Sequence, residues 1–388
     1  MTKRMLSLQE KNNRLGIPLT SPLLLVVTLL LGIGLVQVYS SSFVYAIETY
    51  NDGLFFFKRQ LLYVLVAMVF LFTSLKIQFK YIENWAWLAW VIAAVGIILT
   101  FIPGLGVRAG GAARWIQMPF GFRIEPSELL KISFPLMIAS FFDERNKWVQ
   151  KMNWMVRVGL IVVPLLLLLL QPDFGSFVII SAVGMGLLFA FGLKWRFIFA
   201  SLVVSVPAFY FLVMRVPYRR ARVLSFLNPW NDPEQKGFQA IQSMLSFHSG
   251  GFWGVGLGEA QGKLFFLPEA HTDFTLAIFG EEMGFLGFFV LLSLYGFLFY
   301  RMIKLSLQTE ILFERIFLLG SAMVFALNVF INAGVVMGLL PPKGLTLPFL
   351  SYGGSSVIVL SILFSLIISL ERKIEAREIY NSFSNFSK

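Results

Sequence analysis

Two groups of ionisable residues in this 388-residue chain could take part in chemistry, and the first is suited to acid–base catalysis. Glu269, His271 and Asp273 lie within five residues, directly before a long apolar run. An aspartate in the first turn of a helix is favoured by the positive end of the helix dipole. In a pocket shared with arginines it would stay ionised and could accept a proton as a general base. The alternative is that Thr272 or Asp273 merely caps the helix.

Basic residues form a second group that could bind an anion. Four of them fall within residues 215–222, and Arg114 and Lys131 lie in or beside another polar segment. An anionic ligand would explain such a group, and simple solvation of a long loop is the alternative. Glu128 and Lys131 are three residues apart, so on a helix they would share a face.

Two further patterns have no assigned chemistry. The adjacent acids Glu281 and Glu282 lie inside an apolar run, where a pair of carboxylates needs a partner or a function. Six glycines within residues 250–262 lack the Gly-Lys-Ser/Thr ending and the preceding strand of a phosphate loop. They indicate loop flexibility or close approach of backbone segments.

The composition indicates which solvent surrounds these groups. Hydrophobic residues make up 57% of the chain and charged residues 14%, which is too few for a soluble surface. The net charge of +11 is better explained by cytoplasmic loops beside anionic lipid than by nucleic acid. The chain has no cysteine and two histidines, which excludes disulfides, thiol catalysis and multi-histidine metal sites.

Apolar runs of spanning length predict an all-α polytopic membrane protein with about ten transmembrane helices. The polar sequence Gln-Pro-Asp-Phe-Gly at 171–175 splits one long apolar region into two helices. The predicted helices are 22–45, 60–75, 85–103, 128–142, 157–171, 175–193, 197–214, 273–299, 316–339 and 350–370.

The distribution of basic residues predicts that both termini are cytoplasmic. With this orientation, 19 Lys and Arg residues face inward in short, dense segments and 13 face outward. The chain would be one transmembrane domain, 1–388, with cytoplasmic tails at 1–21 and 371–388. A long extracytoplasmic loop, 215–272, would join helices 7 and 8. The first apolar run is long enough to be a retained signal anchor, in preference to a cleaved signal peptide.

A series of short motifs runs in order along nearly the whole chain. The motifs are Arg-Trp-Ile at 114–116, Pro-Ser-Glu-Leu at 126–129 with Lys131, 171–175, Arg-Arg-Ala-Arg at 219–222, Asn-Pro-Trp at 228–230, Gln-Ser at 242–243, Gly-Leu-Gly at 256–258, 268–274 and 348–356. Together they resemble the SEDS family (shape, elongation, division and sporulation). The strings around 268–274 and 343–348 resemble division-type more than elongation-type members of that family.

The resemblance implies a peptidoglycan glycosyltransferase that polymerises lipid II into glycan strands during cell division. Asp273 matches the essential acid of the family and would be the catalytic base. Glu128 matches a second functional acid. The implied substrate- and diphosphate-binding residues are Arg114, Trp115, Glu128, Lys131, Arg219, Arg220, Arg222, Lys263 and His271. A diphosphate leaving group needs charge stabilisation more than a proton, so one base would suffice.

The resemblance also implies a setting for this reaction. The expected partners are lipid II, the undecaprenyl-linked glycan, a class B penicillin-binding protein and other divisome proteins, in the bacterial cytoplasmic (inner) membrane at the division site. A divalent cation, Mg²⁺ or Mn²⁺, would be the cofactor, with no organic cofactor and no nucleic acid. The alternatives are a lipid II flippase and an elongation-type polymerase. Glu125, His248 and the pair at 259–260 depart from the usual pattern and add charge near the pocket.

Overall fold

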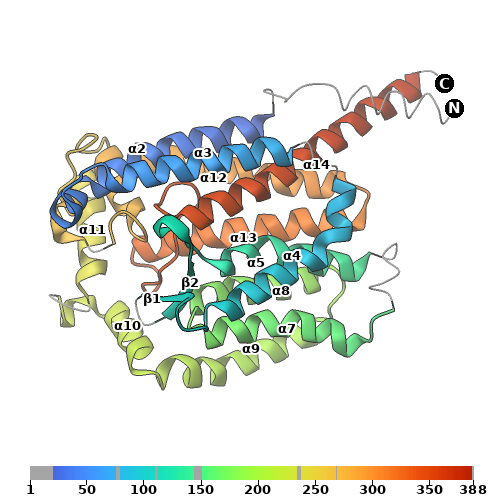
Figure 1. The fold of residues 1–388 in the computed structure, drawn as a ribbon, viewed down its shortest axis with the longest axis horizontal. Helices are drawn as coiled ribbons and strands as arrows, with labels where there is room; N and C mark the ends of the chain where they lie inside the picture. Colours follow the sequence, from blue (N-terminus) through green and yellow to red (C-terminus); the bar gives the residue numbers. More distant parts are fainter. Residues whose placement is uncertain are drawn as a thin grey trace.

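A computed structural model describes most of the chain as one helical bundle (Figure 1). The described residues are 21–75, 79–109, 112–143, 151–233, 237–267 and 269–386. The predicted N-terminal tail, apart from Ser21, lies outside them.

Each of the ten predicted spans has a helix at its position. These helices are α2 (Pro22–Tyr50), α3 (Phe55–Ser74), α4 (Phe79–Leu99), α5 (Pro126–Phe142), α7 (Trp154–Leu170), α8 (Phe174–Ala190), α9 (Trp195–Phe209), α12 (Thr275–Gln308), α13 (Leu312–Val336) and α14 (Gly354–Phe386). The predicted split holds, because α7 ends at Leu170 and α8 begins at Phe174.

The helices have the lengths and surfaces of a polytopic membrane protein. Among the described residues, α2, α3, α4, α12, α13 and α14 contain runs long and apolar enough to cross a bilayer, and α7, α8 and α9 include shorter apolar helices. Large apolar side chains such as Leu25 (61% exposed) and Val203 (71% exposed) cover their outer faces. A soluble protein does not expose so much contiguous apolar surface, whereas lipid tails cover it at no cost.

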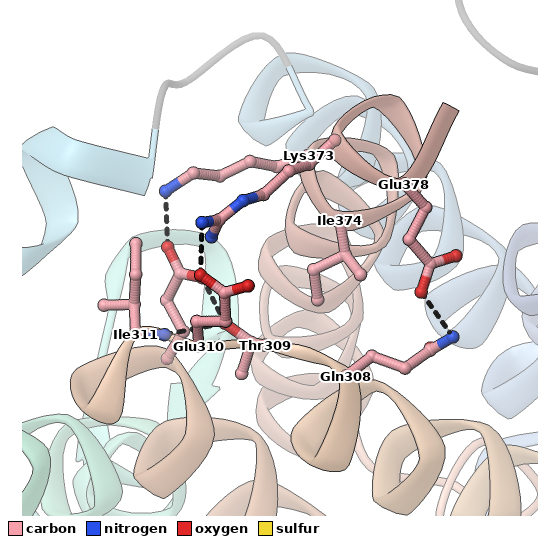
Figure 2. A pocket seen from close by; sticks show the side chains of 9 residues that line it. Gln308, Thr309, Glu310, Ile311, Lys373, Ile374 and Glu378 are labelled. Atoms are coloured by element: carbon pink, nitrogen blue, oxygen red, sulfur yellow. Dashed lines mark hydrogen bonds and ion pairs between the residues drawn. The ribbon is translucent and has the colours of Figure 1, made fainter. Parts of the chain in front are cut away.

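The start of α2 and the end of α14 lie at the same end of the bundle, at the right of Figure 1. Ion pairs join the second half of α14 to α12, α13 and the turn between them: Lys373 to Glu314, Arg377 to Glu310, and Arg301 to Glu371 and Glu375. A cavity of about 60 Å³ lies among these residues (Figure 2). The charged residues that line this cavity are largely paired with one another. We therefore interpret the cavity as a gap in the packing of the helices and not as a binding site.

The segment between α4 and α5 forms a small sheet that the sequence did not predict. Strands β1 (Gly106–Ala109), β2 (Ala112–Gln117) and β3 (Arg123–Ile124) pair antiparallel in that order. Trp115 pairs with Val107 and Ala113 pairs with Arg108, so Arg114 is an extra residue at this step of the pairing. Such a bulge interrupts the regular alternation of side chains at Arg114.

The predicted loop 215–272 is largely folded. It contains α10 (Pro217–Leu227), the short helix η3 (Pro229–Asn231), α11 (Phe238–Gly250) and the π-helix η4 (Gly262–Phe266). In Figure 1, α10 and α11 lie at the left, far from the end of α14.

The longest helix, α12, is broken inside its length. Gly284 has φ +65° and ψ −169°, which is not a helical conformation. The glycine-rich segment 251–256 fills the break: Gly251 and Phe252 accept from the amides of Phe285 and Leu286, while Val255 and Gly256 donate to the carbonyls of Glu281 and Glu282. The glycine cluster therefore serves close backbone approach, one of the two predicted roles.

Replacing Gly254 with alanine should destabilise the protein. Gly254 has φ +83°, and a Cβ there would overlap the carbonyl oxygen of Glu282. Strained backbone of this kind costs about 1–3 kcal/mol, and the overlap adds to it. Thermal unfolding followed by tryptophan fluorescence should show a lower Tm than wild type. Gly104→Ala is the matched control, because Gly104 has φ +89° but open space around it. Equal losses in the two variants would contradict this interpretation of the break.

Candidate active site

Asp273 lies in the turn that leads into α12. The helix begins at Thr275, and its N-cap residue is Phe274 with no side-chain capping bond. Asp273 is therefore neither in the first turn, as predicted, nor a cap. Asn332 of α13 donates to the backbone carbonyl of Asp273 (3.0 Å) and so fixes the turn. No hydrogen bond to the Asp273 carboxylate is found among the described residues, which leaves it available to a ligand.

The surroundings of Asp273 suit a base. Burial raises the pKa of its carboxyl to about 7, and the nearby Glu269 carboxylate also raises it. The Arg222 and Arg114 guanidinium groups act in the opposite direction. A base is most effective when its pKa lies near the working pH. Two arginines thus lie near enough to act on this acid, but burial outweighs their effect on its pKa.

Arg114 of β2 reaches toward Asp273 from the small sheet. Its Nη2 donates to the backbone carbonyl of Pro172 (3.0 Å) and lies 3.9 Å from Asp173 Oδ1. Gly344 lies between the two groups, since a Cβ there would be 3.1 Å from Asp273 Oδ2 and 3.9 Å from Arg114 Nη1. The absence of a side chain at Gly344 thus lets the carboxylate and the guanidinium lie near each other. Trp115, the next residue of β2, is half-buried.

Glu128 and Lys131 form a buried ion pair at the start of α5. Lys131 Nζ lies 2.6 Å from Glu128 Oε1, as the three-residue spacing predicted. Glu128 Oε2 is buried and has no partner within the described part of the chain. Burial and the carboxylates of Glu128 and Asp173 raise the pKa of the neighbouring Glu125 to about 8. Lys131 and Arg114 oppose this shift, so these acids and bases share one electrostatic environment.

The arginines of α10 face two directions. Arg222 Nη1 donates to the carbonyl of Pro342 (3.3 Å), and the Arg219 guanidinium lies 5.5 Å from the ring centre of Phe174. Residues three apart share a helix face, so Arg219 and Arg222 point the same way. Arg220 instead lines a separate groove of about 390 Å³ with Arg215.

The structure adds two residues that the sequence had not singled out. Lys343 lies 4.6 Å from the ring centre of Phe174, the ring that Arg219 also contacts. Burial lowers the pKa of Lys343 to about 8, while Asp173 acts in the opposite direction. Asn332 donates to Asp273 and to Leu345 and joins the two loops of the site. A polar residue inside the apolar run 316–339 was the available signal for Asn332.

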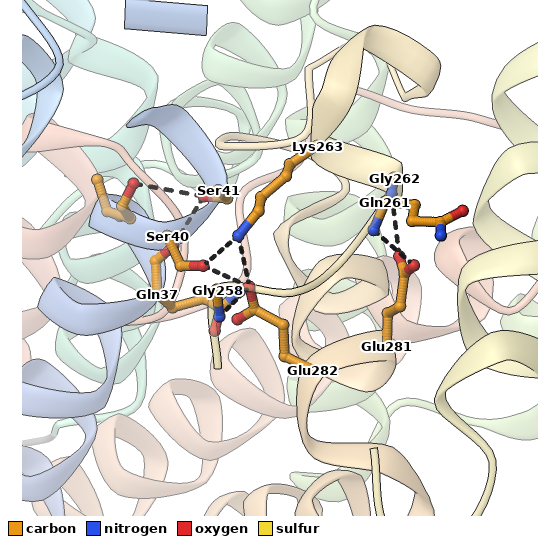
Figure 3. A network of polar contacts seen from close by, with 10 residues as sticks. Gln37, Ser40, Ser41, Gly258, Gln261, Gly262, Lys263, Glu281 and Glu282 are labelled. Atoms are coloured by element: carbon orange, nitrogen blue, oxygen red, sulfur yellow. Dashed lines mark hydrogen bonds and ion pairs between the residues drawn. The ribbon is translucent and has the colours of Figure 1, made fainter. Parts of the chain in front are cut away.

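Lys263 and His271 occupy other surroundings. Lys263 Nζ is paired with Glu282 (3.2 Å) and bonds Ser40 of α2 (Figure 3). The His271 ring stacks on Tyr45 and contacts Phe56 and Tyr352. Burial lowers the pKa of His271, and its carbonyl accepts from the amide of Tyr352 (2.9 Å). Both residues lie on the segment that carries Asp273, but each already has partners of its own.

The side chains of the site provide few metal ligands. Within the part of the chain that the structure describes, no three His, Asp or Glu side chains are grouped closely enough to hold an ion. A magnesium ion bound by one or two carboxylates usually takes its other ligands from substrate phosphates and water. The free oxygen of Glu128 fits such an arrangement better than a metal site built from protein alone.

Sequence relatives match along nearly the whole chain. The FtsW/RodA/SpoVE profile, described as a cell cycle protein, matches residues 21–376. A probable peptidoglycan glycosyltransferase FtsW of Geobacter metallireducens is 41% identical over 339 residues, which cover 87% of this chain and 90% of the relative. Stage V sporulation protein E of Bacillus subtilis is 37% identical, covering 91% of this chain and 98% of the relative.

Solved structures share the fold. A chain from a peptidoglycan synthase complex that coordinates polymerization and crosslinking aligns with a TM-score of 0.70 and 28% identity, covering 90% of this chain and 96% of that chain. Rod shape determining protein RodA of Thermus thermophilus aligns with a TM-score of 0.65 and 25% identity, covering 90% and 95%. With the profile match over 21–376, these likenesses show that the chain belongs to the SEDS family of FtsW, RodA and SpoVE.

Proposed function

We propose that this protein is a peptidoglycan glycosyltransferase that polymerises lipid II at the division site. The observation that carries the proposal is a base with a pKa of about 7 beside arginines, in a chain 41% identical to a probable FtsW glycosyltransferase. Asp273 would take the proton of the acceptor sugar's 4-hydroxyl. The resulting oxygen attacks the anomeric carbon of the donor chain. The bond from that carbon to the undecaprenyl diphosphate breaks, and the configuration inverts.

The leaving diphosphate would lie against Arg114, Arg219, Arg222 and Lys343. Fixed positive charges stabilise the charge that develops on the leaving oxygen, and they are most effective where water is excluded. Glu128 would orient Lys131 or contribute a ligand to a divalent cation, which would supply further charge stabilisation. Arg220 and Lys263 stand apart from this set, since one lines a separate groove and the other is paired with Glu282.

We further propose ten membrane crossings with cytoplasmic termini and an extracytoplasmic site. The start of α2 lies beside α14, where Ser21 bonds Glu371 (2.6 Å), which fits an even number of crossings, and α10 and α11 lie at the other end (Figure 1). The segments 1–21 and 371–388 would be cytoplasmic tails of one transmembrane domain. A class B penicillin-binding protein would be the crosslinking partner, in line with the related chain found in a peptidoglycan synthase complex.

Purified protein supplied with lipid II in vesicles tests the proposed activity. Glycan chains longer than a disaccharide, visible on a gel after lipid removal, would support polymerisation. Transfer of lipid II across the vesicle membrane without chain growth would support the transporter alternative and contradict the proposal. An elongation-type role would instead be indicated if the protein restores rod shape, but not division, in depleted cells.

The rate of polymerisation should follow a bell-shaped pH profile. Asp273 must lose its proton to act as a base, so the rate should rise through about pH 7 and fall about tenfold for each unit below it. Lys343 loses its charge above about pH 8, which should lower the rate on the alkaline side. Initial rates between about pH 5 and pH 9 measure both limbs. A rising limb centred near the ordinary aspartate range would contradict the role of burial at Asp273.

A further inference from the structure

The adjacent acids Glu281 and Glu282 are buried ionisable groups that the proposed reaction does not use. They lie in α12, eight and nine positions after Asp273 in the sequence, and both are almost fully buried. Lys263 pairs with Glu282 at 3.2 Å, with side chains 9% and 0% exposed (Figure 3). Burying two charges in a low-dielectric interior is costly, so we expect this ion pair to have a specific role.

Each acid holds a different part of the loop between α11 and α12. Glu281 accepts from the amides of Gln261 (2.8 Å) and Gly262 (3.2 Å) through its two carboxylate oxygens. Glu282 Oε1 accepts from the amide of Gly258 (3.1 Å) as well as from Lys263. The loop is therefore tied to α12 at three backbone amides and one ammonium.

A third element joins this cluster. Ser40 of α2 donates to Glu282 and accepts from Lys263 Nζ (3.1 Å). In Figure 3 the three side chains point toward one another from α2, η4 and α12. The ion pair thus fixes where the loop lies relative to two helices, and not only its distance from one.

Stability alone does not account for a buried ion pair. Removing two charges from water is costly, and apolar residues of similar size often stabilise a protein equally well or better. What a pair with further hydrogen bonds supplies is a single preferred arrangement of the groups it joins. Here the groups that are held in place lie at the start of the segment that leads to Asp273.

The segment from Lys263 to Asp273 is held at both ends. Near the pair it forms η4, and it continues through the buried Leu267 and Ala270. Near Asp273, the amide of Tyr352 donates to the carbonyl of His271 and Asn332 donates to that of Asp273. A shift at the Lys263 end would pull against these two bonds and move the carboxylate.

We infer that Lys263, Glu281 and Glu282 are positioning residues that hold the Asp273 turn in its reactive place. This inference rests on the proposed glycosyltransferase function. It differs from the diphosphate-binding role that the sequence suggested for Lys263, because the ammonium is turned to Glu282 and Ser40.

The full-length variants Lys263→Met, Glu282→Gln and the double variant test this inference in vesicles with lipid II. Each single change leaves one buried charge unpaired, so kcat should fall at least about tenfold while KM stays within about twofold. The double change removes both charges and should restore most of kcat. Glu259→Gln is the matched control, since this exposed acid on the same loop should leave the rate unchanged.

A second measurement does not depend on activity. Amide hydrogen exchange of residues 256–263 should speed up in each single variant and return toward wild type in the double variant. The inference is overturned if the double variant remains as slow as Lys263→Met, which would indicate direct contact of Lys263 with substrate. It is also overturned if the single variants lower only Tm. If wild type itself fails to polymerise lipid II, the proposed function fails, and hydrogen exchange alone decides whether the pair fixes the loop.

Discussion

Asp273→Asn is expected to lower the rate of lipid II polymerisation by about 100- to 10,000-fold, the usual contribution of a general base. Asparagine has nearly the same shape and keeps the backbone bond from Asn332, but its amide cannot accept the hydroxyl proton at neutral pH. Substrate binding should change little, so the loss should appear in kcat. Burial already limits the charge at this position, so the fold should tolerate the change.

The measurement is chain growth by purified variants at saturating lipid II. Glu269→Gln is the matched control, because it removes a carboxylate from the same turn without touching the base. Glu269 raises the pKa of Asp273, so this variant should stay active and shift the rising limb of the pH profile to lower pH. If Asp273→Asn kept more than about a tenth of the wild-type rate, the role of Asp273 as base would be wrong.

Arg222→Gln is expected to lower kcat by about 100- to 1,000-fold, as the loss of one fixed charge at a reacting oxygen does in other enzymes. The arginine would face the departing diphosphate from α10. It also lowers the pKa of Asp273 more than Arg114 does. The variant should therefore show two effects together, a slower reaction and a rising pH limb displaced to higher pH.

Arg220→Gln provides the comparison for this second effect. Its side chain is on the same helix, but it lines the groove beside Arg215. We expect a much smaller loss and no displacement of the pH profile. Equal losses at the two positions would contradict the division of the arginines between the site and the groove, and would indicate a general electrostatic attraction for an anionic substrate.

The sequence predicted the helices well because lipid imposes a local rule on them. About twenty apolar residues in a bilayer must form a helix, because only then are their backbone hydrogen bonds made within the segment itself. No distant partner is needed. The split after Leu170 followed from a proline and a charge at one place. The small sheet was missed because its strands are two to six residues long and depend on pairing with each other.

The site was predicted where chemistry is local and missed where it depends on long-range contacts. Asp273 and the Glu128–Lys131 spacing were visible in short stretches of sequence. Lys343 and Arg219 approach the same ring only because α10 and the loop before α14 both reach Phe174. The purpose of Glu281 and Glu282 stayed open because their partners belong to α2 and to a loop about twenty residues earlier.

The break in α12 limits how this helix can move. The amides and carbonyls that the break leaves without helical partners bond to the segment 251–256. Transfer of an unbonded peptide group from water to a hydrocarbon costs about 4–8 kcal/mol. The segment 251–256 therefore cannot separate from α12 while the helix stays in the bilayer. Any conformational change that admits substrate would then leave this part of α12 in place and involve other elements of the bundle.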